Sequence, residues 1–316
     1  MKILFTSVGR RVELIEAFRY AVKNNRMFFQ IYGADMDVTA PALKYCDHVV
    51  IVPPIKSKEY IPTLLKICED RKIDALIPTI DTDLQILSEN KELLKQSGTR
   101  VVISSPDKIR ICRDKRLTSD YFNSIGLKSP QSVDDYKKYD GGFPAFIKPK
   151  DGSSSILAFK ANTMEELKVY AEQVPNYIIQ PFISGTEYTV DVLCDFEGNP
   201  IYITPRIRVA VRAGEVLKTE IRQDKKIIEE VKKLLLDYKP CGAITLQLIR
   251  QQETGEDIYI EINPRFGGGA PLSIKAGADS AEALLRLLNG EKLTYQDAAA
   301  EDGAIYSRFE QSIKVK

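Results

Sequence analysis

The first third of the chain alternates between short apolar strands and amphipathic helices, and this alternation constrains the fold more than any other feature. Strands separated by helices of this length predict a parallel sheet with helices on both faces. We expect this α/β unit to span residues 1–106. The expected strands are Lys2–Ser7, Phe28–Ala34, His48–Val52, Ala75–Pro78 and Thr99–Ser104, and the expected helices are Val12–Asn24, Ala40–Tyr45, Tyr60–Arg71 and Asp83–Gln96.

The carboxyl ends of these strands are the expected place for a ligand, because ligands of parallel sheets bind beyond that edge. The edge carries Ser7–Arg11, Asp35 and the segment Thr79–Asp83. The first turn has one glycine and no G-x-G-x-x-G pattern, so it gives a dinucleotide site weak support. Two interpretations stay open for Asp81 and Asp83, which either cap the next helix or contact a substrate.

Composition limits the class of protein. With 316 residues, the chain is too long for one typical core and suits two or three lobes. A net charge of +1 predicts no electrostatic hold on nucleic acid or membrane, and no apolar run is long enough to cross a bilayer. Five widely spaced cysteines without a C-x-x-C pair indicate reduced thiols and a cytoplasmic protein. The only histidine, His48, borders an apolar strand, so we expect a mechanism without histidine.

A lysine-bearing strand and a loop of small residues follow the α/β unit. The pattern predicts one helix over Asp107–Ile125, which carries Lys115, and then a strand over Phe143–Lys150 that turns Lys148 inward between apolar neighbours. The next loop offers backbone N–H groups and hydroxyls that can wrap phosphates, with the lysine as a point charge. Those hydroxyls belong to Ser153, Ser154 and Ser155. A plain hairpin turn is the open alternative.

Alternating strands with short turns dominate the rest of the chain and predict antiparallel pairing. The apolar strand Tyr177–Ile183 offers a backbone edge that can bind an adenine, and Glu187 is placed to accept hydrogen bonds from ribose hydroxyls. The segment Arg206–Glu220 is unusually basic for a strand pair, so it either forms a solvated face or contacts a triphosphate. Within Gly242–Arg250, Gln247 alternates toward the face of a later strand.

That later strand is Ile258–Asn263, followed by Pro264, Arg265 and three glycines. Glu261 and Asn263 lie two positions apart and therefore on one face, where a carboxylate and an amide oxygen suit Mg²⁺. Arg265 offers a planar donor fork for a phosphoryl or acyl oxygen. The glycines let the backbone approach a ligand closely. An edge strand with polar residues facing water is the alternative.

In order and spacing, these motifs resemble the ATP-grasp superfamily, especially its carbamoyl-phosphate-synthase-large-subunit-like proteins and amino-acid ligases. The match covers essentially the whole chain and is strongest at Ile147–Pro149 and Glu261–Arg265. The resemblance implies an α/β fold that is α+β in its C-terminal part. It implies a Rossmann-like lobe over residues 1–106, a small lid lobe with its lead-in helix over 107–183, and a C-terminal lobe with the metal site over 184–316.

The resemblance also implies a role for each candidate residue. ATP is the expected nucleotide, and Mg²⁺ the expected ion with Mn²⁺ as an alternative. Lys148 and Arg265 are the expected catalytic residues, with Arg265 steadying an acyl phosphate. The other implied contacts are Lys115, Lys148 and the loop serines with phosphates, Gln180, Pro181, Phe182 and Ile183 with adenine, Glu187 with ribose, and Glu261, Asn263 and Gln247 with the metal.

The function implied by this resemblance is ATP-dependent ligation of a carboxylate to an amine. The acid would form an acyl phosphate, and amine attack would give an amide, ADP and phosphate. Two alternatives stay open: a nucleotide-binding protein without turnover, because Gln247 stands where the family usually has an acidic residue, and a carboxyphosphate-forming enzyme of the carboxylase type. The expected partners are a small carboxylate and an amine, neither nucleic acid nor membrane, and a homodimer is common among similar proteins.

Overall fold

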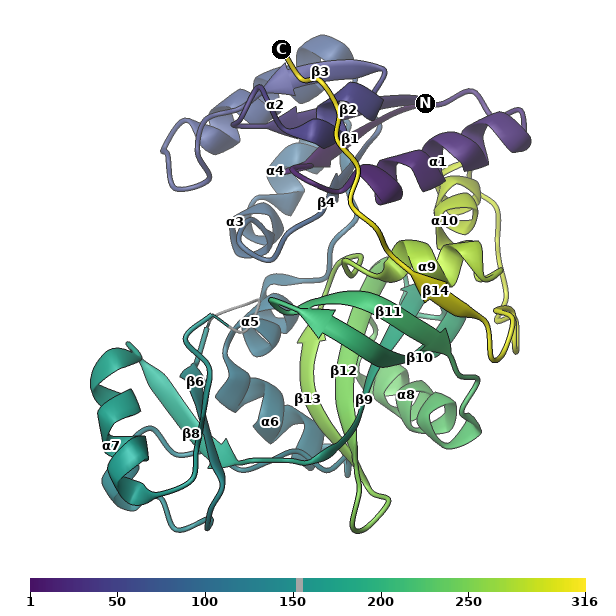
Figure 1. Cartoon of the computed structure of the whole chain (residues 1–316). Helices are drawn as coiled ribbons and strands as arrows, with labels where there is room; N and C mark the ends of the chain where they lie inside the picture. The colour runs from purple at the N-terminus through teal and green to yellow at the C-terminus, as the bar shows by residue number, and fades with distance from the viewer. Residues whose placement is uncertain (152–155) are drawn as a thin grey trace.

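The computed structural model describes residues 1–151 and 156–316, and these residues form three sheets. Each sheet comes from its own part of the chain (Figure 1). In that view the five-stranded sheet lies at the top, the six-stranded sheet lies below it, and the three-stranded sheet stands at the lower left. This mixed architecture confirms the predicted fold class, although the sequence bounds of the three lobes stay a prediction.

The N-terminal sheet is parallel throughout, as the alternation predicts, with the strand order β3-β2-β1-β4-β5. The expected last helix is in fact two helices that meet at Asn90, whose side-chain amide donates to the carbonyl oxygen of Ile86. The strands are β1 Lys2–Thr6, β2 Gln30–Asp35, β3 His48–Ile51, β4 Ala75–Pro78 and β5 Arg100–Val101. The helices are α1 Val12–Asn24, η1 Pro41–Tyr45, α2 Tyr60–Arg71, α3 Leu84–Glu89 and α4 Lys91–Gln96.

The three-stranded sheet is antiparallel, with its lysine-bearing strand in the middle. It consists of β6 Ala145–Pro149, flanked by β7 Phe159–Ala161 and β8 Tyr177–Pro181. Helix α7 (Met164–Gln173) packs on this sheet, and Leu167 contributes to a small separate core. The short 3₁₀ helix η2 (Tyr136–Lys138) lies beside it.

The six-stranded sheet is also antiparallel and carries the second large core. Its strands are β9 Gly185–Cys194, β10 Pro200–Arg212, β11 Glu215–Ile221, β12 Ala243–Gln251, β13 Asp257–Asn263 and β14 Ile305–Ser307. The helices of this part are α8 Lys225–Tyr238, α9 Ala270–Lys275 and α10 Ser280–Leu288. Within the described residues, no helix combines the length and apolar character needed to cross a membrane.

The helix expected over Asp107–Ile125 is wrong as one element, because it divides at Asp114 into α5 (Pro106–Arg113) and α6 (Lys115–Ser124). The backbone at Asp114 is extended, and its carboxylate accepts a hydrogen bond from the Arg116 amide at 2.9 Å. Aspartate favours this N-cap position over a helix interior, because its side chain satisfies an otherwise free N–H group. The break places Lys115 at the first position of a new helix.

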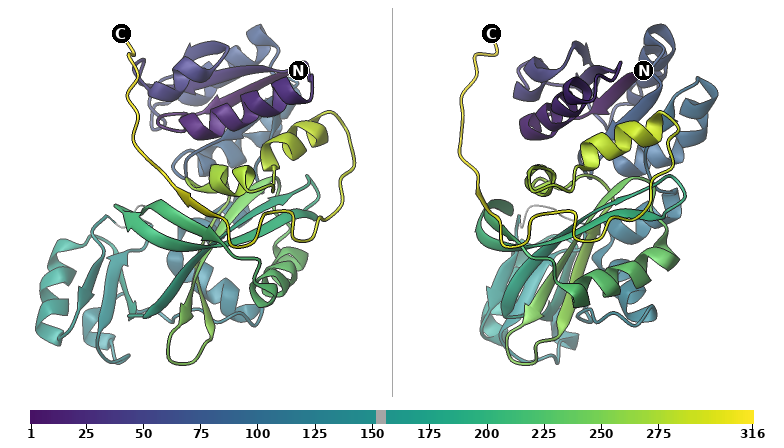
Figure 2. Two further views of the ribbon diagram at one scale, coloured as in Figure 1. Left: turned by 45° about the vertical axis from the view of Figure 1, so that its right-hand side comes forward. Right: turned by 90° about the vertical axis from the view of Figure 1, so that its right-hand side faces the viewer.

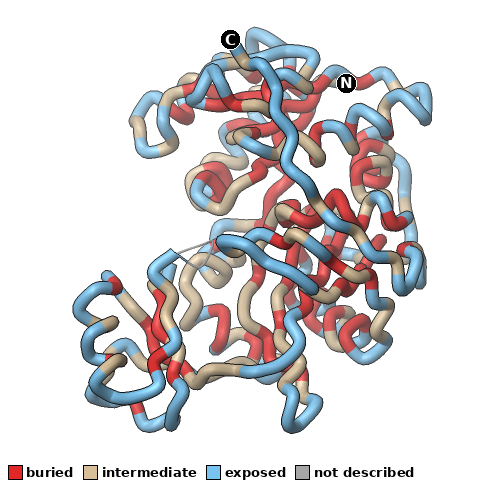
Figure 3. The backbone as a smooth tube through the Cα atoms, viewed as in Figure 1, coloured by how far each residue is buried: buried red, intermediate tan, exposed pale blue. Residues whose placement is uncertain are grey.

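The N-terminal and C-terminal lobes share one core and are joined by the C-terminal tail. Phe18 of α1 packs edge-on against Phe266, with ring centroids 5.7 Å apart. Both views of Figure 2 show the chain after β14 running from the six-stranded sheet along the N-terminal lobe. Figure 3 shows that this tail is mostly exposed, whereas β1, β2 and β4 of the N-terminal sheet are mostly buried. Arg308 in the tail pairs with Glu13 of α1 at 2.9 Å.

Candidate functional site

The pairing of β12 with β13 sets the centre of the site. Their register places Gln247 opposite Glu261 and Thr245 opposite Asn263. The register then shifts, so that Leu248 lies opposite Tyr259 and Ile260 is the extra residue of a bulge. Because of this bulge, consecutive residues Ile260 and Glu261 both line the cavity beside the strands.

This cavity, about 200 Å³ in volume, brings together five of the predicted site residues from five elements. We refer to it as the nucleotide cavity. Its wall also includes Phe146 of β6 and Arg208 of β10. The five predicted residues are Lys115 of α6, Lys148 of β6, Glu187 of β9, Gln247 of β12 and Glu261 of β13.

Two lysines give the nucleotide cavity its electrostatic character. Lys148 is 7% exposed, and burial together with the charge of Lys115 lowers its pKa to about 8, while Glu261 opposes the shift. Burial also lowers the pKa of Lys115, again against the attraction of Glu261. The Lys115 amide donates to the carbonyl oxygen of Lys150 at 3.0 Å, which ties α6 to the end of β6. An anion between these ammonium groups would relieve both shifts.

The predicted adenine segment borders the nucleotide cavity without being part of its wall. Gln180 is buried and lies opposite Phe146 in the β6–β8 pairing. The rings of Phe182 and Phe146 are 6.1 Å apart, and the Phe182 amide donates to the carbonyl oxygen of Pro144. Pro181 and Ile183 are half-buried beside them. The serines Ser153, Ser154 and Ser155 lie outside the described residues.

The basic strands β10 and β11 do not form one solvated face. Arg208 lies in the cavity wall with its side chain 9% exposed and pairs with Glu187, with Nε and Oε2 separated by 3.1 Å. Burial lowers the Arg208 pKa, and Glu187 opposes that shift. Arg212 is exposed and pairs with Glu310. Of these two arginines, Arg208 is therefore the one that a bound triphosphate could reach.

Arg206 is fully buried and supports the glycine-rich turn instead. Its Nε donates to Asp191 at 2.8 Å, and the same carboxylate oxygen accepts from Ser273 at 2.7 Å. A Cβ on Gly269 would lie 2.4 Å from the Arg206 guanidinium, so only glycine fits there. The buried Arg206–Asp191 ion pair thus packs against the glycine-rich turn that follows β13.

The residues after Glu261 form a chain of contacts that reaches the N-terminal lobe. The Asn263 amide donates to Glu261 Oε1 at 3.0 Å, and Arg265 Nη2 donates to Asn263 Oδ1 at 3.2 Å. The same Arg265 nitrogen pairs with Asp81 at 2.7 Å, and both side chains are nearly buried. Asp81 therefore orients Arg265, while Arg265 Nε is buried without a hydrogen-bond partner in the described residues.

Asp83 fits neither of the two sequence interpretations. It precedes α3 but makes no side-chain cap, and it is buried beneath the sheet edge. Its Oδ2 accepts hydrogen bonds from the hydroxyls of Thr6 at 2.8 Å and Ser7 at 3.1 Å. Burial raises the Asp83 pKa to about 6, against these hydrogen bonds. Asp83 thus fixes the loop after β1.

The donor set around Glu261 suits a hard cation with few protein ligands. Among the described residues, no cluster of three or more His, Cys, Asp or Glu side chains is placed to hold a metal. One carboxylate with the neighbouring amides of Asn263 and Gln247 offers oxygen donors only, which is the preference of Mg²⁺ when phosphate oxygens and water complete its shell.

Sequence reasoning missed the partners that orient the predicted residues. The Asp114 cap had a local signal, an aspartate directly before Lys115. The basic strand was a signal for Arg208, but only the fold shows that Arg208 lines the cavity whereas Arg206 pairs with Asp191. The Asp81–Arg265 pair joins positions 184 residues apart, and no local pattern predicts it.

Two family profiles match the chain. Residues 3–102 match the PylC-like N-terminal domain, and residues 112–269 match the ATP-grasp domain. A 3-methyl-D-ornithine–L-lysine ligase of Methanosarcina acetivorans is 27% identical over 280 residues, covering 86% of this chain and 70% of that protein. A carbamoyl-phosphate synthase of Methanobrevibacter smithii is 27% identical over 213 residues, covering 65% of this chain and 55% of that protein.

Solved structures with the same fold extend over nearly the whole chain. The biotin carboxylase domain of Hydrogenobacter thermophilus 2-oxoglutarate carboxylase, in complex with MgADP, has a TM-score of 0.79 at 18% identity and covers 96% of this chain and 73% of its own. N5-carboxyaminoimidazole synthetase of Staphylococcus aureus, complexed with ADP, has a TM-score of 0.74 at 14% identity, over 93% of this chain and 78% of its own. The predicted resemblance is confirmed: this chain belongs to the ATP-grasp domain family.

Proposed function

We propose that the chain is an ATP-dependent carboxylate–amine ligase that works through an acyl phosphate. One observation carries this proposal: two lysines with lowered pKa values meet the carboxylate of Glu261 in one cavity, and Arg265 lies just beyond it. Burial destabilises the ammonium group of Lys148, so this group gains from an anion, and a polyphosphate supplies one. The similarity to ligases that join a carboxylate to an amine supports the same assignment.

The lysines would bind and polarise the transferred phosphoryl group. A carboxylate oxygen of the acid attacks the γ-phosphorus, the bond from phosphorus to the β,γ-bridging oxygen breaks, and ADP leaves. Lys148 and Lys115 would stabilise the charge on the transferred group, mainly by position and electrostatics. Glu261, Asn263 and Gln247 would hold Mg²⁺, which when bound neutralises phosphate charge, and Mn²⁺ accepts the same oxygen donors.

Arg265 would act on the second half of the reaction. The neutral amine attacks the acyl carbon, the bond between that carbon and the phosphate oxygen breaks, and the amine proton passes to the departing phosphate. The Arg265 fork, oriented by Asp81, would stabilise the oxygen that becomes negative in this step. Glu187 and the segment Gln180–Ile183 would hold ribose and adenine beside Arg208.

The test combines ATP binding with ADP release across a panel of acids and amines, with bicarbonate included. We expect ADP release that needs both an acid and an amine. We expect Arg265→Ala to keep the ATP affinity within several-fold and to lower turnover by about 10²- to 10³-fold, the cost of one oxyanion donor. Arg265→Lys keeps a charge beside Asp81 and controls for folding, and the exposed Arg212→Ala is the matched control.

Three results would overturn this proposal. ATP binding without ADP release across the panel, with Arg265→Ala altering affinity alone, would identify a binding protein. ADP release with bicarbonate alone would identify carboxyphosphate formation. Normal turnover in folded Arg265→Ala would remove Arg265 from the mechanism.

We also propose the lobe bounds 1–106, 107–183 and 184–316, a homodimer and a cytoplasmic location. The dimeric biotin carboxylase domain with a similar fold supports the second of these, and five cysteines without a disulfide support the third. Limited proteolysis would test the bounds, because cleavage should concentrate between the lobes. Light scattering of the purified chain would test the dimer.

A further inference from the structure

A second cavity, about 270 Å³ in volume, lies where the N-terminal lobe meets the glycine-rich turn. One wall is the loop after β1, including Arg10 and Arg11, and the opposite wall is the backbone of Gly267 and Gly268. The two cavities have no lining residue in common. The chain from Glu261 to Gly267 runs from the first cavity to the second, and Arg265 lies between those two residues.

Several charges around this second cavity are paired. Arg308 pairs with Glu13 at 2.9 Å and lies 3.8 Å from Glu215, and Lys275 pairs with Glu13 at 3.1 Å. The guanidinium of Arg11 has neither an ion pair nor a hydrogen bond with any residue that the structure describes. Burial, followed by the charge of Arg265, lowers the Arg11 pKa to about 10. Asp81 and Glu215 attract the Arg11 charge and oppose this shift, but no carboxylate forms an ion pair with Arg11 in the part of the chain that the structure describes.

The loop that carries Arg11 is held in position by hydrogen bonds from its own lobe. The Gly9 amide donates to Asp35 at 2.8 Å, and the Thr79 hydroxyl donates to the Ser7 carbonyl oxygen at 2.8 Å. Arg11 also packs against the opposite wall, because a Cβ on Gly268 would lie 3.2 Å from its Nη1. The guanidinium is thus presented in a fixed place, which lowers the entropy lost when a ligand binds it.

The position of the cavity assigns the anion to one of the two substrates. The reacting carboxylate of the acid must face the γ-phosphate, and therefore the lysines of the nucleotide cavity. The amine adds to one face of the trigonal acyl carbon while the phosphate is still attached to that carbon. An anion at Arg11 would lie in the separate second cavity, away from the reacting carboxylate, so we assign it to a group carried by the amine. Ammonia or a simple alkylamine has no such group.

We propose that Arg11 binds the carboxylate of the amine substrate, so that this substrate is an amino acid. This inference rests on the ligase function proposed above and adds the class of its second substrate. A planar guanidinium matches a carboxylate with two parallel hydrogen bonds, whereas Arg308 and Lys275 are already engaged by Glu13 and Glu215. The cavity volume is below the usual range for pockets that bind drug-sized ligands, and it suits a ligand of amino-acid size.

The experiment compares each amino acid with its carboxamide, at saturating ATP and acid. Wild type should favour the free amino acid in kcat/KM by about 10- to 100-fold, the value of a charge-assisted hydrogen bond. In Arg11→Gln this preference should fall close to one through a higher KM for the amino acid, with the KM values for ATP and acid unchanged. Arg11→Lys should keep part of the preference, and the exposed Arg110→Gln should keep all of it.

Hydroxylamine separates failure of this inference from failure of the ligase function, because it traps an acyl phosphate as a hydroxamate without needing a carboxylate. Wild type and Arg11→Gln should form hydroxamate from the acid at equal rates. If wild type forms none with any acid, the ligase function fails. If hydroxamate forms but amino acids and carboxamides react equally, or no amino acid reacts, the inference on Arg11 is overturned. A higher KM for the acid in Arg11→Gln would overturn it too, by assigning the anion to the acid.

Discussion

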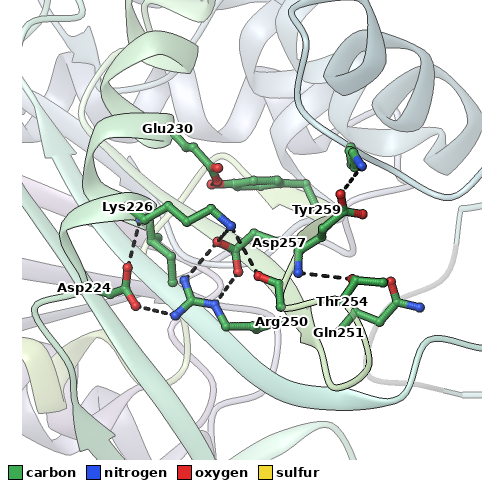
Figure 4. A network of polar contacts seen from close by, with 12 residues as sticks. Asp224, Lys226, Glu230, Arg250, Gln251, Thr254, Asp257 and Tyr259 are labelled. Atoms are coloured by element: carbon green, nitrogen blue, oxygen red, sulfur yellow. Dashed lines mark hydrogen bonds and ion pairs between the residues drawn. The ribbon is translucent and has the colours of Figure 1, made fainter.

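The cations near the two ends of the β12–β13 pair differ in whether carboxylates pair with them. At the hairpin end, Asp257 holds Arg250 at 2.7 and 2.9 Å and Lys226 at 3.0 Å, and Asp224 also pairs with Arg250 (Figure 4). These partners raise the Arg250 pKa. At the other end, burial lowers the pKa of Lys148 to about 8, and no carboxylate among the described residues forms an ion pair with it.

This contrast distinguishes charged groups that stabilise the fold from charged groups that gain a partner only when a ligand binds. A cation whose carboxylates are already present contributes to one folded arrangement, and removing a partner leaves a buried charge. A cation that burial destabilises in the free protein gains most when an external anion arrives. We therefore propose that the charges at the hairpin end of the strands stabilise the fold and that those at the bulged end bind phosphate.

The largest expected effect comes from Lys148→Met in the nucleotide cavity. Turnover should fall by about 10³-fold and MgATP affinity should weaken, because a charge-assisted contact to the transferred phosphoryl group is lost. The free energy of unfolding should stay the same or rise, because a poorly paired buried cation is removed. Kinetics and denaturant unfolding would measure both, with the exposed Lys168→Met as control. A large loss of stability would place Lys148 with the structural charges.

The opposite pattern is expected for Asp257→Ala at the hairpin end. The free energy of unfolding should fall by about 3 kcal/mol, because Arg250 and Lys226 both lose a fully buried partner. MgATP affinity of the folded protein should not change. Denaturant unfolding and calorimetric titration are the measurements, and Glu253→Ala in the exposed hairpin turn is the control. Weaker nucleotide binding without lost stability would contradict the division between the two ends.

A smaller effect is expected in the pH dependence of stability. The pKa of Lys148 is about 8 in the folded chain and near the ordinary lysine value of 10.5 when unfolded, so the unfolded state binds more protons between these pH values. The free energy of unfolding should therefore rise with pH across this window by about 1 to 3 kcal/mol more in wild type than in Lys148→Met. Unfolding curves from pH 7 to pH 10.5 would measure the difference, and parallel curves would contradict the lowered pKa.

How much of the site is predictable from sequence depends on whether a residue is placed by a local pattern or by tertiary packing. Lys148, Gln247, Glu261 and Asn263 were predicted because strand alternation fixes the face on which each side chain lies. The helix through Asp114 was predicted wrongly, because helical periodicity outweighed a single capping residue. The Asp81–Arg265 pair and the unpaired Arg11 depend on how two lobes pack. Contacts between distant segments are set by tertiary structure, which local patterns do not encode.

Proton uptake on nucleotide binding tests the central claim, that the buried ammonium group of Lys148 binds a phosphate of the nucleotide. At pH 8.5 much of Lys148 is neutral, and a bound triphosphate should raise its pKa and draw in a proton. Titration of MgATP by calorimetry in buffers of different ionisation enthalpy counts the protons exchanged. We expect wild type to take up about half a proton or more, and Lys148→Met to take up correspondingly less. Equal uptake by the two proteins would contradict the account.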